Sequence, residues 1–147
     1  MPVEELSFMK LIVFLFKRYI LTLVTSVVIL CLTFYKPVGI VRTNTVVELD
    51  KVVHFIMYFT QCAVFWYESF KITLHPRKIL MVVFAVIVPI IFSGAMEYLQ
   101  YLLTSYRTGD FDDFVFNTIG VIVASVFSLF VTRPYMVKRE KSKRGDN

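Results

Sequence analysis

The sequence predicts an all-α membrane protein: a bundle of four transmembrane helices with both termini in the cytoplasm. The 147 residues are 57% hydrophobic and have a mean hydropathy of +0.69, whereas soluble domains are roughly 45–50% apolar. Four apolar runs of about 17 to 20 residues are separated by shorter polar segments, and a helix of about 20 apolar residues crosses a bilayer. The basic residues also divide unequally between the two sides of such a bundle, which indicates its orientation.

A chain this short predicts one membrane domain, which we assign to residues 19–132, and no separate soluble domain. An N-terminal cytoplasmic or interfacial segment, residues 1–18, precedes it, and a basic cytoplasmic tail, residues 133–147, follows it. The N-terminus carries two acidic residues where a signal peptide has positive charge, so we expect it to be retained. The four spans are expected over residues 19–35, 51–67, 79–96 and 113–132.

The first span follows a shorter apolar stretch. Residues 6–16 are too few to cross a bilayer, so they predict either a helix lying in the membrane interface or a cytoplasmic extension of the first span. The span itself has a tyrosine at each end, with Lys17, Arg18 and Lys36 just outside. Aromatic and basic residues at these positions are typical of the two membrane interfaces.

The second span is expected to begin after a loop. Pro37 and Gly39 predict that loop over residues 36–49, and Asp50 then stands where a helix N-cap is expected. Both cysteines of the chain, Cys31 and Cys62, lie within apolar runs without CxxC spacing. We interpret them as buried thiols with no redox or metal role.

The second span carries three polar residues on one face. His54, Tyr58 and Gln61 follow one another at spacings of four and three, which places them together on a helix. Polar groups avoid lipid, so this face should turn towards the bundle. Gln61 is the deepest polar residue, and little continues beyond it, so the sequence disfavours a path for protons or ions across the membrane.

The third and fourth spans also contain packing signals. Pro89 cannot donate a hydrogen bond to the Ala85 carbonyl, so it should bend the third span, and Ser93 and Gly94 offer a surface for close packing. That helix is expected to end at Glu97. In the fourth span three residues recur at spacings of three and four and give a narrow face for helix contact: Asn117, Gly120 and Ala124.

The distribution of basic residues fixes the predicted orientation. Twelve of the 16 lysines and arginines lie on the side of the two termini and four on the other side, so the termini are expected in the cytoplasm and the loops 36–49 and 97–112 outside. The formal net charge of +5 is spread between apolar runs and over the tail. It indicates anionic membrane headgroups as partners and no nucleic acid.

This orientation gathers unusual polar residues at the outer ends of three helices. Asp50, His54 and Glu97 are the candidates for catalytic acid, base or ligand roles. The candidates for binding and positioning a substrate are Gln100, Arg107, Asp113, Asn117 and Tyr58, with the Arg107 guanidinium suited to an anionic group.

Two other interpretations of the same residues stay open. Asp50, His54, Glu97 and Asp113 offer oxygen and imidazole ligands, but their spacing matches no dedicated metal motif, so we predict no metal site. The cluster could also be purely structural: acidic residues capping helices, Arg107 pairing with Asp110 or Asp113, and Glu97 with His54 locking helices together.

Two motifs resemble the VanZ-like family of small bacterial membrane proteins. Asp50 to Phe59, DKVVHFIMYF, is similar to the family pattern D-K-x-x-H-F-x-x-Y-F. The second motif is similar to E-x-x-Q, then R-T, then D-x-x-x-N-x-x-G, and places in register Glu97, Gln100, Arg107, Thr108, Asp113, Asn117 and Gly120. The resemblance implies a multi-pass protein of the bacterial cytoplasmic (inner) membrane, associated with tolerance to the glycopeptide teicoplanin.

Two hypotheses of function follow. In the first, the outer polar site binds or modifies an amphiphilic envelope molecule, so that the partners are membrane lipids or lipid-linked envelope precursors. In the second, the protein is a non-catalytic structural or interaction protein whose cluster only holds helices together. The sequence assigns no cofactor, no protein partner and no reaction.

Overall fold

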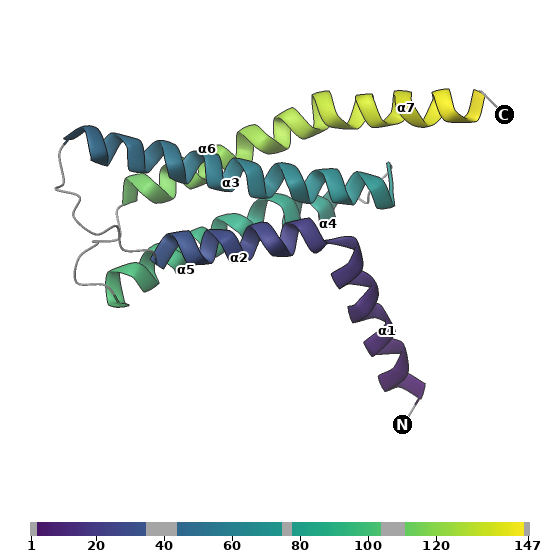
Figure 1. The fold of residues 1–147 in the computed structure, drawn as a ribbon, viewed down its shortest axis with the longest axis horizontal. Coiled ribbons are helices and arrows are strands. Elements are labelled where there is room, and N and C mark those ends of the chain that lie inside the picture. Colours follow the sequence, from purple (N-terminus) through teal and green to yellow (C-terminus); the bar gives the residue numbers. More distant parts are fainter. Residues whose placement is uncertain (1–2, 35–43, 75–77, 104–110, 146–147) are drawn as a thin grey trace.

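A computed structural model describes residues 3–34, 44–74, 78–103 and 111–145, and these residues are almost entirely helical and contain no strand. The predicted all-α class is therefore confirmed for this part of the chain. In chain order the elements are α1 (Val3–Arg18), α2 (Ile20–Phe34), α3 (Asn44–Ile72), α4 (Lys78–Val82), the π-helical turn η1 (Val83–Ile87), α5 (Val88–Leu103), α6 (Phe111–Phe127), the π-helical turn η2 (Ser128–Thr132) and α7 (Arg133–Gly145) (Figure 1).

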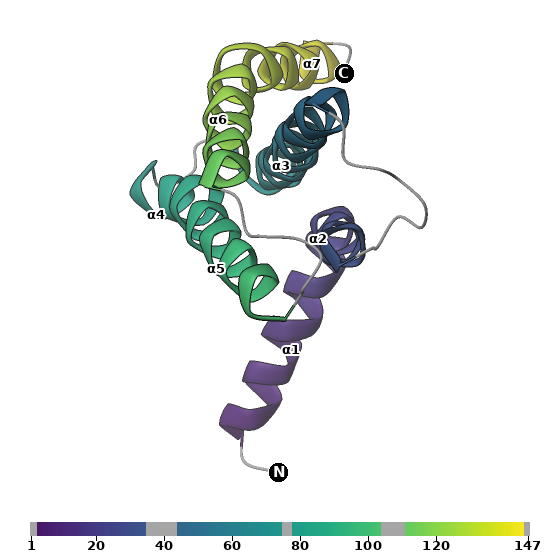
Figure 2. The ribbon, with the colours of Figure 1, turned by 90° about the vertical axis from the view of Figure 1, so that its left-hand side faces the viewer.

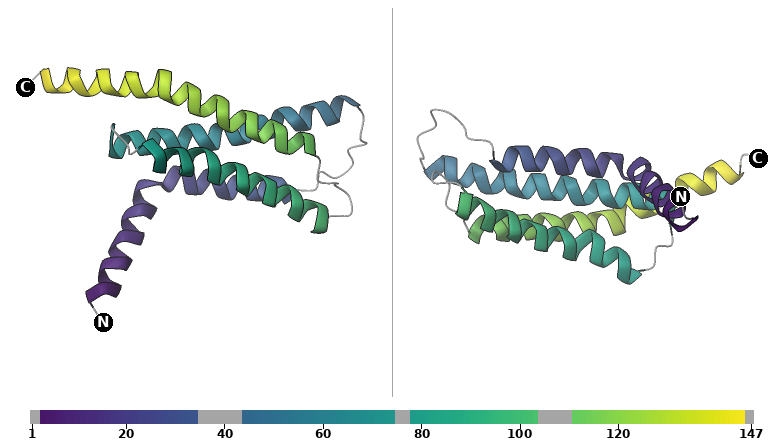
Figure 3. Two further views of the ribbon diagram at one scale, coloured as in Figure 1. Left: turned by 180° about the vertical axis from the view of Figure 1, so that it is seen from behind. Right: turned by 90° about the horizontal axis from the view of Figure 1, so that it is seen from below.

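Four rods form the bundle and alternate in direction: α2, α3, α4 with η1 and α5, and α6 with η2 and α7 (Figure 1). Seen along the bundle, α3 lies between α2 and α6, and α5 packs against α6 (Figure 2). The first helix, α1, turns away from the bundle where α2 begins, and α7 continues α6 beyond the bundle (Figure 3). Helices α1 and α7 thus leave from the same end of the bundle.

The surface of the bundle is apolar and much of its interior is polar. Large hydrophobic side chains are widely exposed, among them Ile79 at 81%, Ile91 at 67% and Phe130 at 77%, whereas Gln100 and Asn117 are completely buried. This distribution is the reverse of that in soluble proteins. Within the described residues, the helices Ile79–Leu103 and Phe111–Gly145 are long and apolar enough to cross a membrane. The chain therefore has the character of a membrane protein.

The number of spans stays a prediction, because the described helices differ in length and polarity. α2 is apolar but has only 15 residues, and α3 has 29 residues but carries charged side chains towards both of its ends. A helix of 15 residues is short for a hydrocarbon core about 30 Å thick.

The closest helix pair is α3 with α6, which cross at Gly120. A Cβ atom built on Gly120 would lie 2.6 Å from the backbone oxygen of Phe55 and 3.1 Å from the backbone nitrogen of Phe59. Only a residue without a side chain permits this approach of two backbones. The predicted contact face is confirmed, since Asn117, Gly120 and Ala124 are all buried.

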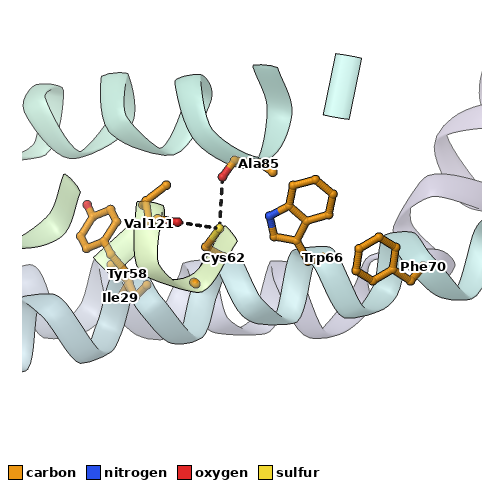
Figure 4. Close-up of a cluster of buried hydrophobic side chains, with 8 residues drawn as sticks. Ile29, Tyr58, Cys62, Trp66, Phe70, Ala85 and Val121 are labelled. Carbon is orange, nitrogen blue, oxygen red and sulfur yellow. Dashed lines mark hydrogen bonds between the residues drawn. The ribbon is translucent and has the colours of Figure 1, made fainter. Parts of the chain in front are cut away.

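A hydrophobic core runs along the inner face of α3 (Figure 4). Tyr58, Cys62, Trp66 and Phe70 succeed one another at spacings of four and are all nearly inaccessible to solvent. The Trp66 indole N–H donates to Ser125 Oγ at 3.1 Å, so the polar edge of the ring has a partner inside the bundle. The inner face of α3 therefore supplies part of the hydrophobic core and also makes a polar contact with α6.

Pro89 and Pro134 each lie shortly after a π-helical turn. η1 ends two residues before Pro89, and η2 ends two residues before Pro134. Proline lacks an N–H and its ring crowds the carbonyl four residues earlier, and the wider turn relieves that conflict. For Pro89 this carbonyl belongs to Ala85, and it accepts a hydrogen bond from Cys62 Sγ at 3.2 Å (Figure 4). The neighbouring helix thus satisfies the freed carbonyl.

Two predicted boundaries are wrong. α3 begins at Asn44, so residues 44–49 are helical and Asp50 lies inside the helix rather than at its N-cap. No glycine or proline occurs between residues 44 and 72 to interrupt it. The third helix likewise continues past Glu97 to Leu103. The part of the predicted loop at residues 36–43 lies outside the described residues.

The other predicted segments agree more closely with the observed helices. α2 coincides with the predicted first span as far as Phe34, and α6 begins at Phe111, two residues before the predicted fourth span. The predicted interfacial stretch is helical, and the basic tail forms α7, a helix with no buried residues. Cys62 is buried as predicted, but Cys31 is exposed because it lies on the outer face of α2.

Gly120→Ala is expected to destabilise the bundle, because its methyl group would collide with the backbone of α3. The cost should be about 1–3 kcal/mol, as for other overpacked cores, and should lower the melting temperature of the protein in detergent. Gly145→Ala is the matched control, since a Cβ there meets nothing within 4 Å. Equal melting temperatures for the two variants would show that the crossing at Gly120 does not limit helix approach.

Candidate functional site

The structure brings five of the predicted site residues together, from three helices. Asp50 and His54 come from α3, Glu97 from α5, and Asp113 and Asn117 from α6. These five residues form what we call the polar cluster. Arg107 and Thr108, which the sequence associates with it, lie outside the described residues.

His54 is at the centre of the polar cluster and is only 2% exposed. Its Nε2 lies 3.9 Å from Asp50 Oδ1 and 3.8 Å from Asp113 Oδ2. Its Nδ1 lies 3.1 Å from Asn117 Oδ1 and 3.7 Å from Glu97 Oε1. One ring nitrogen thus faces two carboxylates, and the other faces an amide and a third carboxylate.

The Asn117 side chain fixes the orientation of the imidazole. Its Nδ2 donates to Ser93 Oγ at 2.8 Å and to Glu97 Oε1 at 3.4 Å, so its Oδ1 points at His54 Nδ1. A carbonyl oxygen only accepts hydrogen bonds, so Nδ1 of His54 carries the hydrogen. In the neutral ring the lone pair is then on Nε2, the nitrogen that faces Asp50 and Asp113.

Two of the predicted binding residues have other surroundings. Tyr58 is 3% exposed and its hydroxyl is hydrogen-bonded to the Ser93 side chain, which connects it to the polar cluster through Asn117. Gln100 is fully buried and donates from Nε2 to the backbone oxygen of Thr33 at 2.6 Å. Gln100 therefore ties α5 to the C-terminal end of α2.

Access to the polar cluster is on the α3 side. The Asp50 side chain is 36% exposed, whereas those of Asp113 and His54 are 5% and 3% exposed. Beside them Lys51 forms an ion pair with Asp112, whose side chain is 55% exposed. The two neighbouring aspartates of α6 therefore differ sharply: Asp113 points into the bundle and Asp112 lies on its surface.

The arrangement suits two kinds of chemistry. An imidazole held between carboxylates can take up and release a proton, as general acid–base catalysis requires. The donor atoms of Asp50, His54 and Asp113 also lie within 4.8 Å of one another, and nitrogen and carboxylate oxygen are both metal ligands. Glu97 is on the opposite side of the imidazole from this group.

An apolar cavity of about 370 Å³ lies next to the polar cluster, between α2, α3 and the rod formed by η1 and α5. Its walls include Ile29, Leu30, Phe84 and Phe92, and Tyr58 lines its end nearest the cluster. Leu30, Phe84 and Phe92 are also 36–55% exposed on the bundle surface. The cavity is therefore a cleft that reaches the apolar surface, and we call it the α2–α5 cleft.

A buried carboxylate at the other end of α3, Glu68, was not among the residues predicted from the sequence. Glu68 is 4% exposed and accepts hydrogen bonds at 3.0 Å from the backbone nitrogens of Leu21 and Thr22. It thus caps the start of α2 from a neighbouring helix. Its position seven residues after Gln61 continues the same helical face and could have revealed it.

The buried polar face also extends further than predicted. Gln61 donates from Nε2 to Ser26 Oγ at 2.7 Å and to the Thr22 backbone oxygen at 3.3 Å, and Thr22 Oγ1 donates to Glu68 at 2.7 Å. Polar contacts therefore continue beyond Gln61. Every one of them joins α2 to α3, which is a structural role.

The comparison with known proteins agrees with the two sequence motifs. A sequence-family model described as VanZ/LLP1 matches residues 3–132. The match covers most of the chain, from α1 to the end of η2, and includes every residue of the polar cluster. No curated protein and no solved structure matches the chain significantly.

Glu68→Ala is expected to destabilise the protein by about 0.5–2 kcal/mol, as the loss of a helix cap does. It would leave two backbone N–H groups of α2 without their acceptor, which is costly in an apolar surrounding. Thermal unfolding in detergent measures the effect. Glu140→Ala, in which a carboxylate on the exposed α7 is removed, should melt like the parent protein, and a Glu68 variant that does the same would contradict the capping role.

Proposed function

The chain belongs to the VanZ/LLP1 family, and on that premise we propose that it is a multi-pass membrane protein whose polar cluster binds an amphiphilic molecule of the cell envelope. One observation carries the proposal: the buried polar cluster is continuous, through Tyr58, with an apolar cleft. A group of polar side chains beside an apolar groove suits a molecule with a head group and a hydrocarbon chain.

The proposed placement in the membrane follows from the charges and the topology. The polar cluster lies near the N-terminal ends of α3 and α6, away from the end where α1 and α7 leave the bundle (Figure 1). With the termini in the bacterial cytoplasm, as the basic residues favour, the cluster belongs to the outer half of the inner membrane. Lipid-linked envelope precursors are exposed on that face.

The α2–α5 cleft would hold the hydrocarbon chain. Its volume of about 370 Å³ is within the range of small-molecule sites, roughly 300–1,000 Å³. The exposed wall residues make it accessible sideways from the lipid, so an amphiphile need not leave the membrane to bind. The Gln100 contact with Thr33 joins α5 to α2 at the outer end of the bundle.

The polar cluster would hold the head group. Tyr58, Ser93 and Asn117 have hydroxyl and amide groups, and the Glu97 carboxylate lies 3.7 Å from His54 Nδ1. We propose that these residues bind the head group and that Arg107 neutralises an anionic part of it. The proposal extends to chemical alteration of the bound molecule, in which His54 and Glu97 would act as acid and base.

A link to glycopeptide tolerance follows from the family resemblance. Teicoplanin acts on the outer face of the membrane, where we place the polar cluster. We therefore propose that binding of an envelope amphiphile at this face reduces the action of the glycopeptide.

The competing proposal is a non-catalytic role in which the cluster only locks helices together. It is favoured by the contacts within the cluster, because Asn117 of α6 reaches both His54 of α3 and Ser93 of α5. The two proposals make opposite predictions for variants that keep the fold.

His54→Ala and Glu97→Gln are expected to abolish teicoplanin tolerance and to weaken binding of a polyprenyl phosphate to the purified protein by roughly ten- to a hundredfold, as the loss of a hydrogen bond to a charged group does. Tolerance is measured in a bacterial host, and binding by native mass spectrometry in detergent. The abundance and melting temperature of both variants should stay near those of the parent.

Asp112→Asn is the matched control, because this carboxylate lies on the surface beside the polar cluster. It should keep both tolerance and binding. If His54→Ala and Glu97→Gln keep them too, the binding proposal is wrong. If they lose function only in proportion to abundance, the locking role is correct.

Leu30→Trp is expected to fill the α2–α5 cleft and to lower affinity for the polyprenyl phosphate at least about tenfold, while a soluble head-group analogue without a chain should bind unchanged. Val27→Trp adds the same bulk to α2 at a site 58% exposed and outside the cleft wall, and should have no effect. Equal affinity in both tryptophan variants would exclude the cleft as the site of the chain.

A further inference from the structure

We propose that Asp50, His54 and Asp113 bind a single divalent transition-metal cation, at what we call the cation site. The sequence alone predicts no metal site, because the spacing of these residues matches no ligand motif. The inference goes beyond the proposed function, and binding of the cation does not depend on a bound amphiphile.

The distances around His54 Nε2 suit a shared cation better than hydrogen bonds. The separations of 3.9 Å to Asp50 Oδ1 and 3.8 Å to Asp113 Oδ2 exceed the 2.7–3.2 Å of N–H···O hydrogen bonds. Ligands about 2.0–2.2 Å from one tetrahedral cation are themselves roughly 3.3–3.6 Å apart. The two separations from Nε2 are therefore only a few tenths of an ångström longer than this, and all three donor atoms lie within 4.8 Å of one another.

The hydrogen-bond pattern around the imidazole provides a second argument. Asn117 accepts from Nδ1–H of His54 and is itself oriented by Ser93, which is fully buried. Histidines that bind metals usually donate their other N–H to such an acceptor, which fixes the tautomer and aims the lone pair at the cation. Here the lone pair on Nε2 is aimed between the two aspartates.

The ligands come from two helices whose separation is already fixed. Asp50 and His54 lie one turn apart on α3, and Asp113 lies in the first turn of α6. The close crossing at Gly120, two turns further along α6, restrains both helices. Little ordering is then needed when a cation binds, and the partly exposed Asp50 provides the entry.

The donor atoms determine the class of cation. One imidazole nitrogen and two carboxylate oxygens form a mixed set, without the thiolates that select soft metals. Zn²⁺ and Mn²⁺ both accept such ligands, whereas Mg²⁺ and Ca²⁺ prefer oxygen alone. Positions left free by three protein ligands would be open to solvent or to a head group.

Equilibrium binding of Zn²⁺ and Mn²⁺ to the chelator-treated, purified full chain in detergent tests the cation site. One ion per chain is expected to bind, with Mg²⁺ much weaker. His54→Ala and Asp113→Asn should each lower the affinity by more than a hundredfold, and Asn117→Ala by about ten- to a hundredfold, as changes in the outer shell of ligands do. These measurements need no lipid, so their outcome is separate from that of the amphiphile experiments.

Asp112→Asn is the matched control, because it removes the neighbouring carboxylate that faces outwards. It should bind the cation as the parent does. Absence of 1:1 binding by the parent protein would overturn the proposal whatever the variants do. Equal losses in Asp112→Asn and Asp113→Asn would also overturn it, since they would indicate only attraction of cations to surface charge.

Discussion

The close crossing of α3 and α6 at Gly120 is the contact on which the site depends. Because no side chain separates the helices there, the backbone of α6 approaches Phe55 and Phe59 of α3 directly. Asn117, one turn earlier on α6, can then reach His54 at 3.1 Å. In an apolar surrounding a buried imidazole needs such partners inside the protein. Helix packing and the polar cluster are thus consequences of one constraint.

The spacing of residues predicted the faces of the helices better than their ends. His54 and Tyr58, or Asn117 and Gly120, were assigned correctly to buried faces because lipid excludes polar groups and a helix repeats every 3.6 residues. The start of α3 and the end of α5 were misplaced, since neither residues 44–49 nor residues 98–103 contain a proline or glycine that would end a helix. The exposed Cys31 was missed because an apolar residue suits lipid contact as well as the core.

Contacts between helices could not be read from the sequence. Pro89 predicted a freed carbonyl at Ala85, but only the structure identifies Cys62 as its donor. The α2–α5 cleft is likewise invisible in the sequence, because its walls come from three separate segments. The convergence of three helices on His54 was predicted only as a common side of the membrane, whereas a cation site requires distances.

The carboxylates near the two ends of α3 have different surroundings. Glu68 accepts hydrogen bonds from two backbone N–H groups and the Thr22 hydroxyl, all from α2. These contacts satisfy a helix end and hold its oxygens in place. At the other end, Asp50 and Asp113 lie 3.8–3.9 Å from an imidazole nitrogen, beyond hydrogen-bonding distance, and Asp50 is partly exposed. Glu68 therefore stabilises the start of α2, whereas the separations of Asp50 and Asp113 from the imidazole nitrogen are close to those between ligands of one cation. This difference in geometry distinguishes the two ends of α3, and the proposed cation site rests on it.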